Sequence, residues 1–127
     1  MDIGQLNTVG IGRIYGAYDC PCCGSHEQTA RVAFGAGAVA KLPELMTDVA
    51  PSGATVTIAY DRNAESVFVA ARRACMRSGL LCCECALDAD ASIYEAERVE
   101  IPEQTRAIVA VGGGSVIDLV KYAAQFH

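Results

Sequence analysis

Tryptophan is absent from this chain of 127 residues, and all aromatic residues together make up 6% of it. No apolar stretch reaches the roughly 20 residues that a membrane-spanning helix requires. The first twenty residues contain no charged n-region followed by an apolar h-region, so the pattern of a secretory signal is missing. We therefore expect a cytoplasmic protein that does not enter a membrane.

A basic excess is missing as well. Ten Lys and Arg residues stand against 15 Asp and Glu residues, which gives a net charge of −5. This balance argues against a surface for nucleic acid or anionic membranes, although a local basic pair such as Arg72-Arg73 can lie on a solvated helix face. With 52% apolar residues, the chain has enough material for one domain around a single core.

Cysteine is not scarce, and the count of seven is odd. The residues form two groups and one isolated position: Cys20, Cys22 and Cys23; Cys82, Cys83 and Cys85; and Cys75. An odd count in an Ala-rich chain with helical patterns predicts free thiols in a reducing compartment, not a disulfide scaffold. We expect the second group to be small, buried apolar residues of a strand.

Strand and helix patterns alternate along the chain. Strands are predicted at 31–34, 55–60, 80–87 and 106–111, and helices at 38–49, 63–78, 93–99 and 115–126. This alternation predicts an α/β, Rossmann-like fold with a mainly parallel sheet and helices on both faces, which binds ligands at the carboxyl ends of its strands. Residues 1–30 are expected to be a Cys-rich loop or edge segment, and residues 31–127 one α/β domain.

Three glycines follow the last predicted strand. Gly112, Gly113 and Gly114 permit a sharp turn and a close approach of bare backbone to a ligand. The helix that follows from Ser115 offers N–H groups without partners and the positive end of its dipole, so the sequence predicts a phosphate site here. The alternative is a plain strand-to-helix turn in which Ser115 is the N-cap and Asp118 completes a capping box.

A second glycine pair offers a competing location. Gly35-x-Gly37-x-x-Ala40 follows a predicted strand and opens a helix, and Asp61 stands about twenty residues further on, as in a dinucleotide fingerprint. Taken alone, this motif would place a pyrophosphate in that turn. The match is weak, because the chain is rich in Gly and Ala and the preceding strand is short.

The run from Gly112 to Ala124, Gly-Gly-Gly-Ser-Val-Ile-Asp-Leu-Val-Lys-Tyr-Ala-Ala, resembles the signature of a known superfamily. It contains the iron-type alcohol dehydrogenases, glycerol dehydrogenase, glycerol-1-phosphate dehydrogenase and dehydroquinate synthase. Segments 34–38, 42–45 and 59–61 are similar to the same family in order and spacing, and only 88–104 matches weakly. The Asp-Leu-x-Lys-Tyr-Ala-Ala ending looks most like the glycerol-1-phosphate dehydrogenase branch.

The cluster Cys20, Cys22, Cys23 and His26 resembles a tag near the start of some relatives in that branch. As a zinc site its spacing is poor, because structural zinc usually draws a second ligand pair from a distant segment and none stands out downstream. The tag supports the resemblance, and its chemical role is left open.

The resemblance implies that the glycine triplet and Ser115 hold the pyrophosphate of NAD, while the Gly35-x-Gly37 turn is structural. It also implies that Asp61 accepts the hydroxyls of the adenosine ribose. A carboxylate there repels a 2′-phosphate and favours NAD, whereas the adjacent Arg62 keeps NADP possible. From the residues alone, Asp61-Arg62-Asn63 could instead turn the chain and cap the next helix.

Asp118 and Lys121 lie three residues apart, on one face of the last helix. The resemblance implies that both act on the substrate side, Asp118 near the nicotinamide or substrate hydroxyls and Lys121 near an anionic or polar group. Family members polarise the alcohol with a divalent metal, Zn, Fe or Ni, held by Asp and His residues of a helical second domain. This chain has only His26 and His127. We therefore expect neither a metal site nor a complete catalytic set in it.

The resulting hypothesis is the nucleotide-binding domain of a metal-dependent polyol or glycerol-phosphate dehydrogenase, cut after its last helix. Expected partners are a dinucleotide and a small polyol or phosphorylated polyol. A second copy of the chain is also expected to cover an apolar surface beside helix 115–126. Two alternatives stay open: a domain of a dehydroquinate-synthase-like enzyme, against which Lys121 counts, and a stand-alone, non-catalytic nucleotide-binding module.

Overall fold

The computed structural model describes residues 10–20, 24–88 and 92–126. In chain order the elements are β1 (Gly10–Cys20), β2 (Gly24–Phe34), the 3₁₀ turn η2 (Ala38–Lys41), α1 (Leu42–Leu45), β3 (Thr55–Asp61), the 3₁₀ turn η3 (Arg62–Ala64), α2 (Glu65–Arg77), β4 (Leu81–Leu87), α3 (Ile93–Ala96), β5 (Thr105–Val111) and α4 (Gly114–Ala124). No helix within these ranges is both long and apolar enough to span a membrane.

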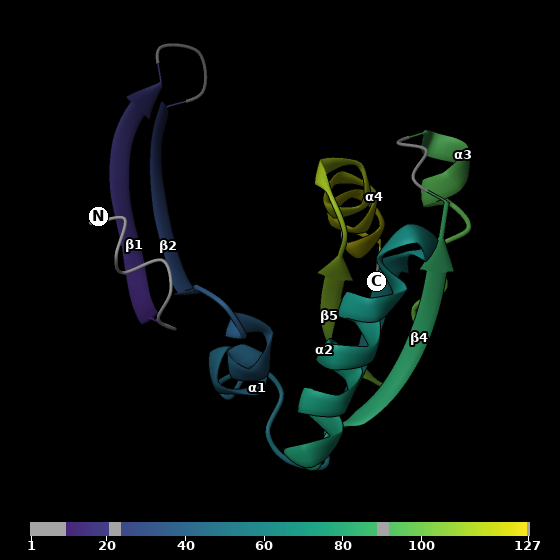
Figure 1. Cartoon of the computed structure of the whole chain (residues 1–127). Coiled ribbons are helices and arrows are strands. Elements are labelled where there is room, and N and C mark those ends of the chain that lie inside the picture. The colour runs from purple at the N-terminus through teal and green to yellow at the C-terminus, as the bar shows by residue number, and fades with distance from the viewer. Residues whose placement is uncertain (1–9, 21–23, 89–91, 127) are drawn as a thin grey trace.

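A parallel sheet of three strands, in the order β4-β3-β5, carries the fold. After β3 the chain forms α2 and adds β4 on one side, and it then crosses over to add β5 on the other side. One core cluster joins α2 to the sheet and a second joins α4 to it, so the helices cover opposite faces (Figure 1). The predicted α/β, Rossmann-like fold is confirmed.

The central position of β3 explains its apolar sequence. Val56, Thr57, Ile58 and Ala59 are each 0% exposed, because both faces of the strand are covered. Alternate residues of a strand point to opposite faces. Val56 and Ile58 belong to the core under α2, and Ala59 belongs to the core under α4. Asp61 follows Ala59 by two positions and therefore lies on the α4 face.

The N-terminal segment differs from the sequence-based expectation. A loop or short edge segment is predicted for residues 1–30, whereas β1 and β2 are strands of 11 residues each. They pair antiparallel, with Gly10 opposite Phe34, in a sheet separate from β4-β3-β5. The strand predicted at 31–34 is thus the end of β2 and not a strand of the parallel sheet. A backbone ladder needs no apolar alternation, and the scattered glycines obscure the period of two on which the prediction depends.

The helix predicted over 38–49 is interrupted. The turn η2 is followed by a separate one-turn helix, α1, with Pro43 in its first turn. Proline has no N–H to donate to the carbonyl of Val39, so the ladder breaks there, and the missing donor is tolerated at the start of a new helix. Val49, the last residue of the predicted helix, is 50% exposed.

The other predicted boundaries are close to those observed. Strands β3, β4 and β5 match their predicted ranges within one residue at each end, and helices α2 and α4 match within two. The helix predicted at 93–99 is shorter, because α3 ends at Ala96. The prediction of element type is therefore most reliable within the parallel sheet.

Candidate functional site

Asp61 and Gly112 lie side by side at the carboxyl edge of the sheet. Tyr60 and Val111 are register partners in the parallel pair β3 and β5, so the residues that follow them also meet. A Cβ atom built on Gly112 would lie 3.2 Å from the Cβ of Asp61. Because β4 and β5 were added on opposite sides of β3, this edge is the topological switch point at which open α/β sheets bind ligands.

Gly112 is required by this close approach. Its φ is +152°, a conformation that residues with a side chain rarely adopt. A Cβ there would also lie 3.1 Å from the Cβ of Val116, which is fully buried under the sheet. The first glycine of the triplet therefore lets the chain pass between Asp61 and α4.

The next glycine begins the helix. Gly113 is the N-cap of α4, and no side chain caps it. The first intrahelical bond runs from the Ile117 N–H to the Gly113 carbonyl, at 3.2 Å. The N–H groups of the first turn, on Gly114, Ser115 and Val116, precede that bond and have no partner in the helix ladder. Ser115 lies inside the helix, so the alternative in which Ser115 is the N-cap is wrong.

The space above this turn is open. Gly113 and Gly114 are exposed, and a Cβ built on either would meet no heavy atom within 4 Å. Unpartnered N–H groups and the positive end of the helix dipole face this space. The turn therefore fits an anionic group such as a phosphate.

Asp61 also caps the turn that follows β3, which is the alternative role that the sequence leaves open. Its Oδ1 accepts a hydrogen bond from the Asn63 N–H at 2.8 Å, and it is the N-cap of η3. A carboxylate has two oxygens with about four acceptor positions, and this bond uses one of them. Capping and the binding of ribose hydroxyls are thus compatible at Asp61.

Arg62 is engaged by a partner that the sequence analysis did not identify. Its Nε lies 3.2 Å from Oδ1 of Asp88, and both side chains are largely exposed. Leu87 is the register partner of Asp61, so Asp88 and Arg62 are the next residues of the two strand ends. The available signal was the position of Asp88 directly after a predicted strand, which places it at the carboxyl edge.

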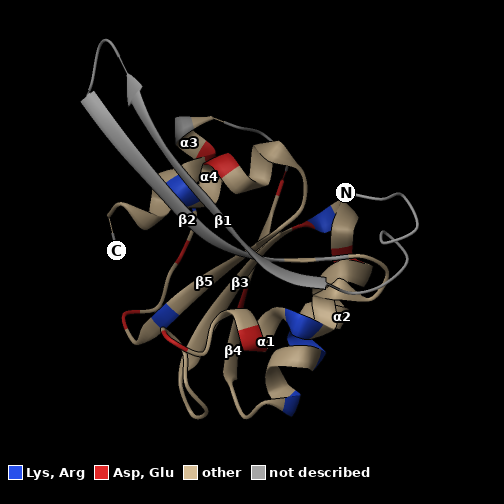
Figure 2. Ribbon diagram, turned by 90° about the vertical axis from the view of Figure 1, so that its left-hand side faces the viewer, with Lys and Arg blue, Asp and Glu red and all other residues tan. Residues whose placement is uncertain are grey.

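Asp118 and Lys121 lie on α4, and both are exposed; Figure 2 shows these charged positions as a red and a blue band on the helix. Asp118 belongs to the second turn. Lys121 belongs to the last turn, about 10 Å along the helix axis from Gly114 at 1.5 Å per residue. The structure therefore places Asp118 nearer the glycine turn than Lys121.

The early glycine pair lies in a different setting. Gly35 and Gly37 both have positive φ, and they connect the hairpin strand β2 to the short turn η2. The dinucleotide fingerprint needs a parallel strand followed by a helix that presents its N-terminus. Neither the antiparallel β2 nor the four-residue η2 meets that description, which favours a structural role for this turn.

Cys75 is buried in the core, whereas Cys82, Cys83 and Cys85 on β4 are only half-buried. The prediction that this second group is buried is therefore wrong, because β4 is an edge strand of the sheet. Cys75, Cys82, Cys83 and Cys85 are free thiols. Burial raises the pKa of Cys75 to about 11 and also raises the pKa of Cys82, so both are neutral at neutral pH. Neutral thiols are poor nucleophiles and poor metal ligands.

Metal ligands are not gathered in the described part of the chain. Within residues 10–20, 24–88 and 92–126, no group of three or more His, Cys, Asp or Glu side chains could hold a metal ion. Cys22, Cys23 and His127 lie outside these residues, so the N-terminal Cys and His cluster is not tested as a whole. The described residues thus supply no site for the divalent metal expected from the resemblance.

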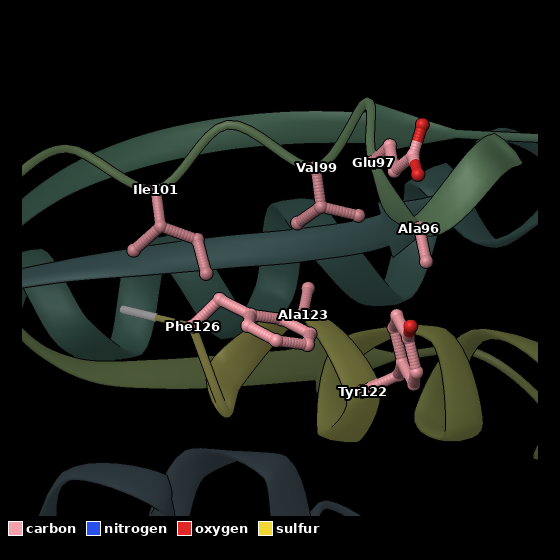
Figure 3. A pocket seen from close by; sticks show the side chains of 7 residues that line it. All are labelled: Ala96, Glu97, Val99, Ile101, Tyr122, Ala123 and Phe126. Atoms are coloured by element: carbon pink, nitrogen blue, oxygen red, sulfur yellow. The ribbon is translucent and has the colours of Figure 1, made fainter. Parts of the chain in front are cut away.

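A cavity of about 400 Å³ lies at the other end of α4. In Figure 3 the side chains of Val99 and Ile101 face those of Ala123 and Phe126 across it. Phe126 is 74% exposed and packs edge-on against Tyr122, with ring centroids 5.4 Å apart. Glu97 and the Tyr122 hydroxyl add polar groups to this lining, and the cavity is distinct from the glycine turn.

Residues 33–127 match the family model described as iron-containing alcohol dehydrogenase. No curated protein and no solved structure gave a significant match. The matched range includes the whole parallel sheet, Asp61, the glycine triplet and α4.

Proposed function

Because this chain belongs to the iron-containing alcohol dehydrogenase family, we propose that its α/β part binds NAD(P) at the edge formed by β3 and β5. The observation that carries the proposal is the close approach of Gly112 to Asp61 at the switch point, where a Cβ on Gly112 would lie 3.2 Å from the Asp61 Cβ, with an open glycine turn beside it. We further propose that the parent activity is a polyol or glycerol-phosphate dehydrogenase, for which the Asp-Leu-x-Lys-Tyr-Ala-Ala ending is the support.

The glycine turn, Asp61, Asp118 and Lys121 each contact a different part of the cofactor or substrate in this proposal. The N–H groups of the turn bind the pyrophosphate, because they are unpartnered donors at a positive helix end. Asp61 accepts the adenosine ribose hydroxyls with the carboxylate positions that its cap does not use. Asp118, one turn further along α4, reaches the nicotinamide or the substrate hydroxyls, and Lys121 attracts an anionic group.

When bound, the nicotinamide supplies the hydride acceptor for the alcohol carbon. The described residues account for holding and orienting that cofactor. They do not account for polarising the alcohol, because they contain no group of three metal-ligating side chains. We therefore assign cofactor binding to the described residues.

The proposal is tested by titration calorimetry of the chain with NAD, NADH and ADP-ribose. All three should bind weakly and with similar affinity, because the proposed contacts are to the pyrophosphate and the adenosine ribose and not to the nicotinamide. Nicotinamide mononucleotide, which lacks those parts, is the matched control and should not bind. Absence of binding for all three in a chain that circular dichroism shows to be folded would refute the nucleotide site.

We also propose that a second copy of the chain covers the apolar surface beside α4. Phe126 is 74% exposed and Tyr122 is 39% exposed, and exposed apolar patches tend to associate. Sedimentation at increasing concentration should detect a dimer, and Phe126→Ser should shift it toward monomer. Val49→Ser is the control, since Val49 is 50% exposed outside this surface. A wild-type chain that stays monomeric at high concentration would exclude this arrangement.

A cytoplasmic location completes the proposal. Its support is the set of free thiols Cys75, Cys82, Cys83 and Cys85, because thiols persist in a reducing compartment. Cell fractionation with the chain carrying a small tag would test it.

A further inference from the structure

We infer that Asp88 is a specificity-determining residue that makes the site select NAD over NADP. The inference rests on the proposed function and extends it to a residue outside the glycine turn and other than Asp61. Asp88 acts on Arg62, the cation that directly follows Asp61 and could otherwise meet a 2′-phosphate.

Arg62 and Asp88 form a pair at the ends of two neighbouring strands. Leu87 and Asp61 are register partners at the ends of β4 and β3, and Asp88 and Arg62 follow them directly. The Arg62 Nε and the Asp88 Oδ1 lie 3.2 Å apart, which is both an ion pair and a hydrogen bond. Arg62 is thus directed toward the β4 side, whereas the glycine turn lies on the β5 side of Asp61.

A 2′-phosphate at this edge would meet a net negative charge. Arg62 contributes +1 to this edge, and Asp61 and Asp88 contribute −1 each, so the three residues sum to −1. A 2′-phosphate on a ribose bound by Asp61 would need Arg62 as its bidentate partner. It would have to compete with Asp88 for the guanidinium and approach two carboxylates. NAD has hydroxyls at that position and meets neither difficulty.

Glu95 holds the backbone of Asp88 in place. The backbone N–H of Asp88 donates to Oε1 of Glu95 at 3.4 Å. Glu95 is anchored in turn, because its own N–H donates to the Ser92 Oγ at 3.1 Å and its carboxylate lies 3.7 Å from Arg98. The support reaches Asp88 through its backbone, so a change of the Asp88 side chain leaves it intact.

The test measures the affinity of the chain for ADP-ribose and for its 2′-phosphate, and for NAD and NADP, in wild type and in Asp88→Asn. Asparagine keeps the size of the side chain and removes its charge. The affinity for the 2′-phosphorylated ligands should rise about 5-fold, the scale of one exposed charge contact, while NAD affinity stays unchanged. The gain should shrink as salt is added, because the contact is exposed.

Two further variants isolate the cause. Asp88→Asn combined with Arg62→Ala should lose the gain, because Arg62 is the group that Asp88 releases. Glu84→Gln is the matched control: Glu84 is an exposed β4 carboxylate that pairs with Arg72 at 3.7 Å, so the net charge changes equally but away from the edge. It should leave the ratio of NAD to NADP affinity unchanged.

Three results would overturn the inference. The first is an unchanged ratio of NAD to NADP affinity in Asp88→Asn. The second is an equal change of NAD and NADP affinity in that variant, which would point to a structural effect. The third is the same gain in Glu84→Gln, which would point to net charge alone. Failure of the proposed function is a different result: the folded wild-type chain would then bind neither NAD nor NADP. Asp88 would have no cofactor to select in that case, and the inference would be rejected with its premise.

Discussion

Replacing Gly113 with valine is expected to abolish detectable NAD binding while the chain stays folded. A Cβ at Gly113 meets no heavy atom within 4 Å, and the backbone there has an ordinary extended conformation with φ −82°, so the fold accepts a side chain. The same open space is where the pyrophosphate would lie, and a branched side chain fills it. The loss of an N-cap glycine should cost at most about 1 kcal/mol of unfolding free energy. Calorimetry with NAD and urea denaturation measure the two effects separately.

The matched control is Gly37→Val, in the competing glycine motif. Gly37 has φ +77°, and forcing a residue with a side chain into that region costs about 1–2 kcal/mol, more for a β-branched one. This variant should lose stability and keep its NAD affinity. If Gly37→Val removed binding in a stable chain and Gly113→Val did not, the phosphates would belong in the early turn.

Truncating Phe68 to alanine is expected to have the largest effect on stability. Phe68 is 4% exposed, and its ring stacks on that of Tyr60 with centroids 3.9 Å apart and planes 11° from parallel. Tyr60 precedes Asp61, so this stack joins α2 to the strand end that carries the site. Phe-to-Ala changes in cores lower the unfolding free energy by about 3–5 kcal/mol, a large part of the total for a domain of this size.

Urea denaturation followed by circular dichroism measures that loss. Val69→Ala, on the same helix but 41% exposed, is the control and should cost less than about 1 kcal/mol. Alanine has a higher helix propensity than Phe or Val, so a similar loss in both variants would contradict the prediction that the packing of Phe68 on Tyr60 controls stability here.

The hairpin illustrates where sequence patterns fail. The pairing of β1 with β2 satisfies backbone N–H and C=O groups and does not need a regular apolar period. A Gly- and Cys-rich segment can therefore form long strands although its sequence shows no strand pattern. The broken helix at Pro43 is the opposite case. Proline in the sequence was the available signal, and an apolar period of 3.6 residues outweighed it in the prediction.

The sequence by itself determined the local elements of the parallel sheet and the two helices that cover it. Mainly apolar runs specify β3 and β5, because a strand covered on both faces buries a polar side chain only with a hydrogen-bond partner, as Thr57 does with Thr105 at 2.8 Å. The glycines after β5 specify the turn into α4. Membership of the iron-containing alcohol dehydrogenase family also follows from the sequence, through the match over residues 33–127. That Asp61 and the glycine triplet bind NAD stays a prediction.

Only the tertiary structure decided which of these elements meet. The strand order β4-β3-β5 sets Gly112 beside Asp61 and Asp88 beside Arg62, over separations of 51 and 26 positions. It also left the Gly35 and Gly37 turn outside the parallel sheet. Local patterns cannot contain this information, because the side of β3 on which each later strand pairs depends on the burial of two helix layers at once and not on any short segment.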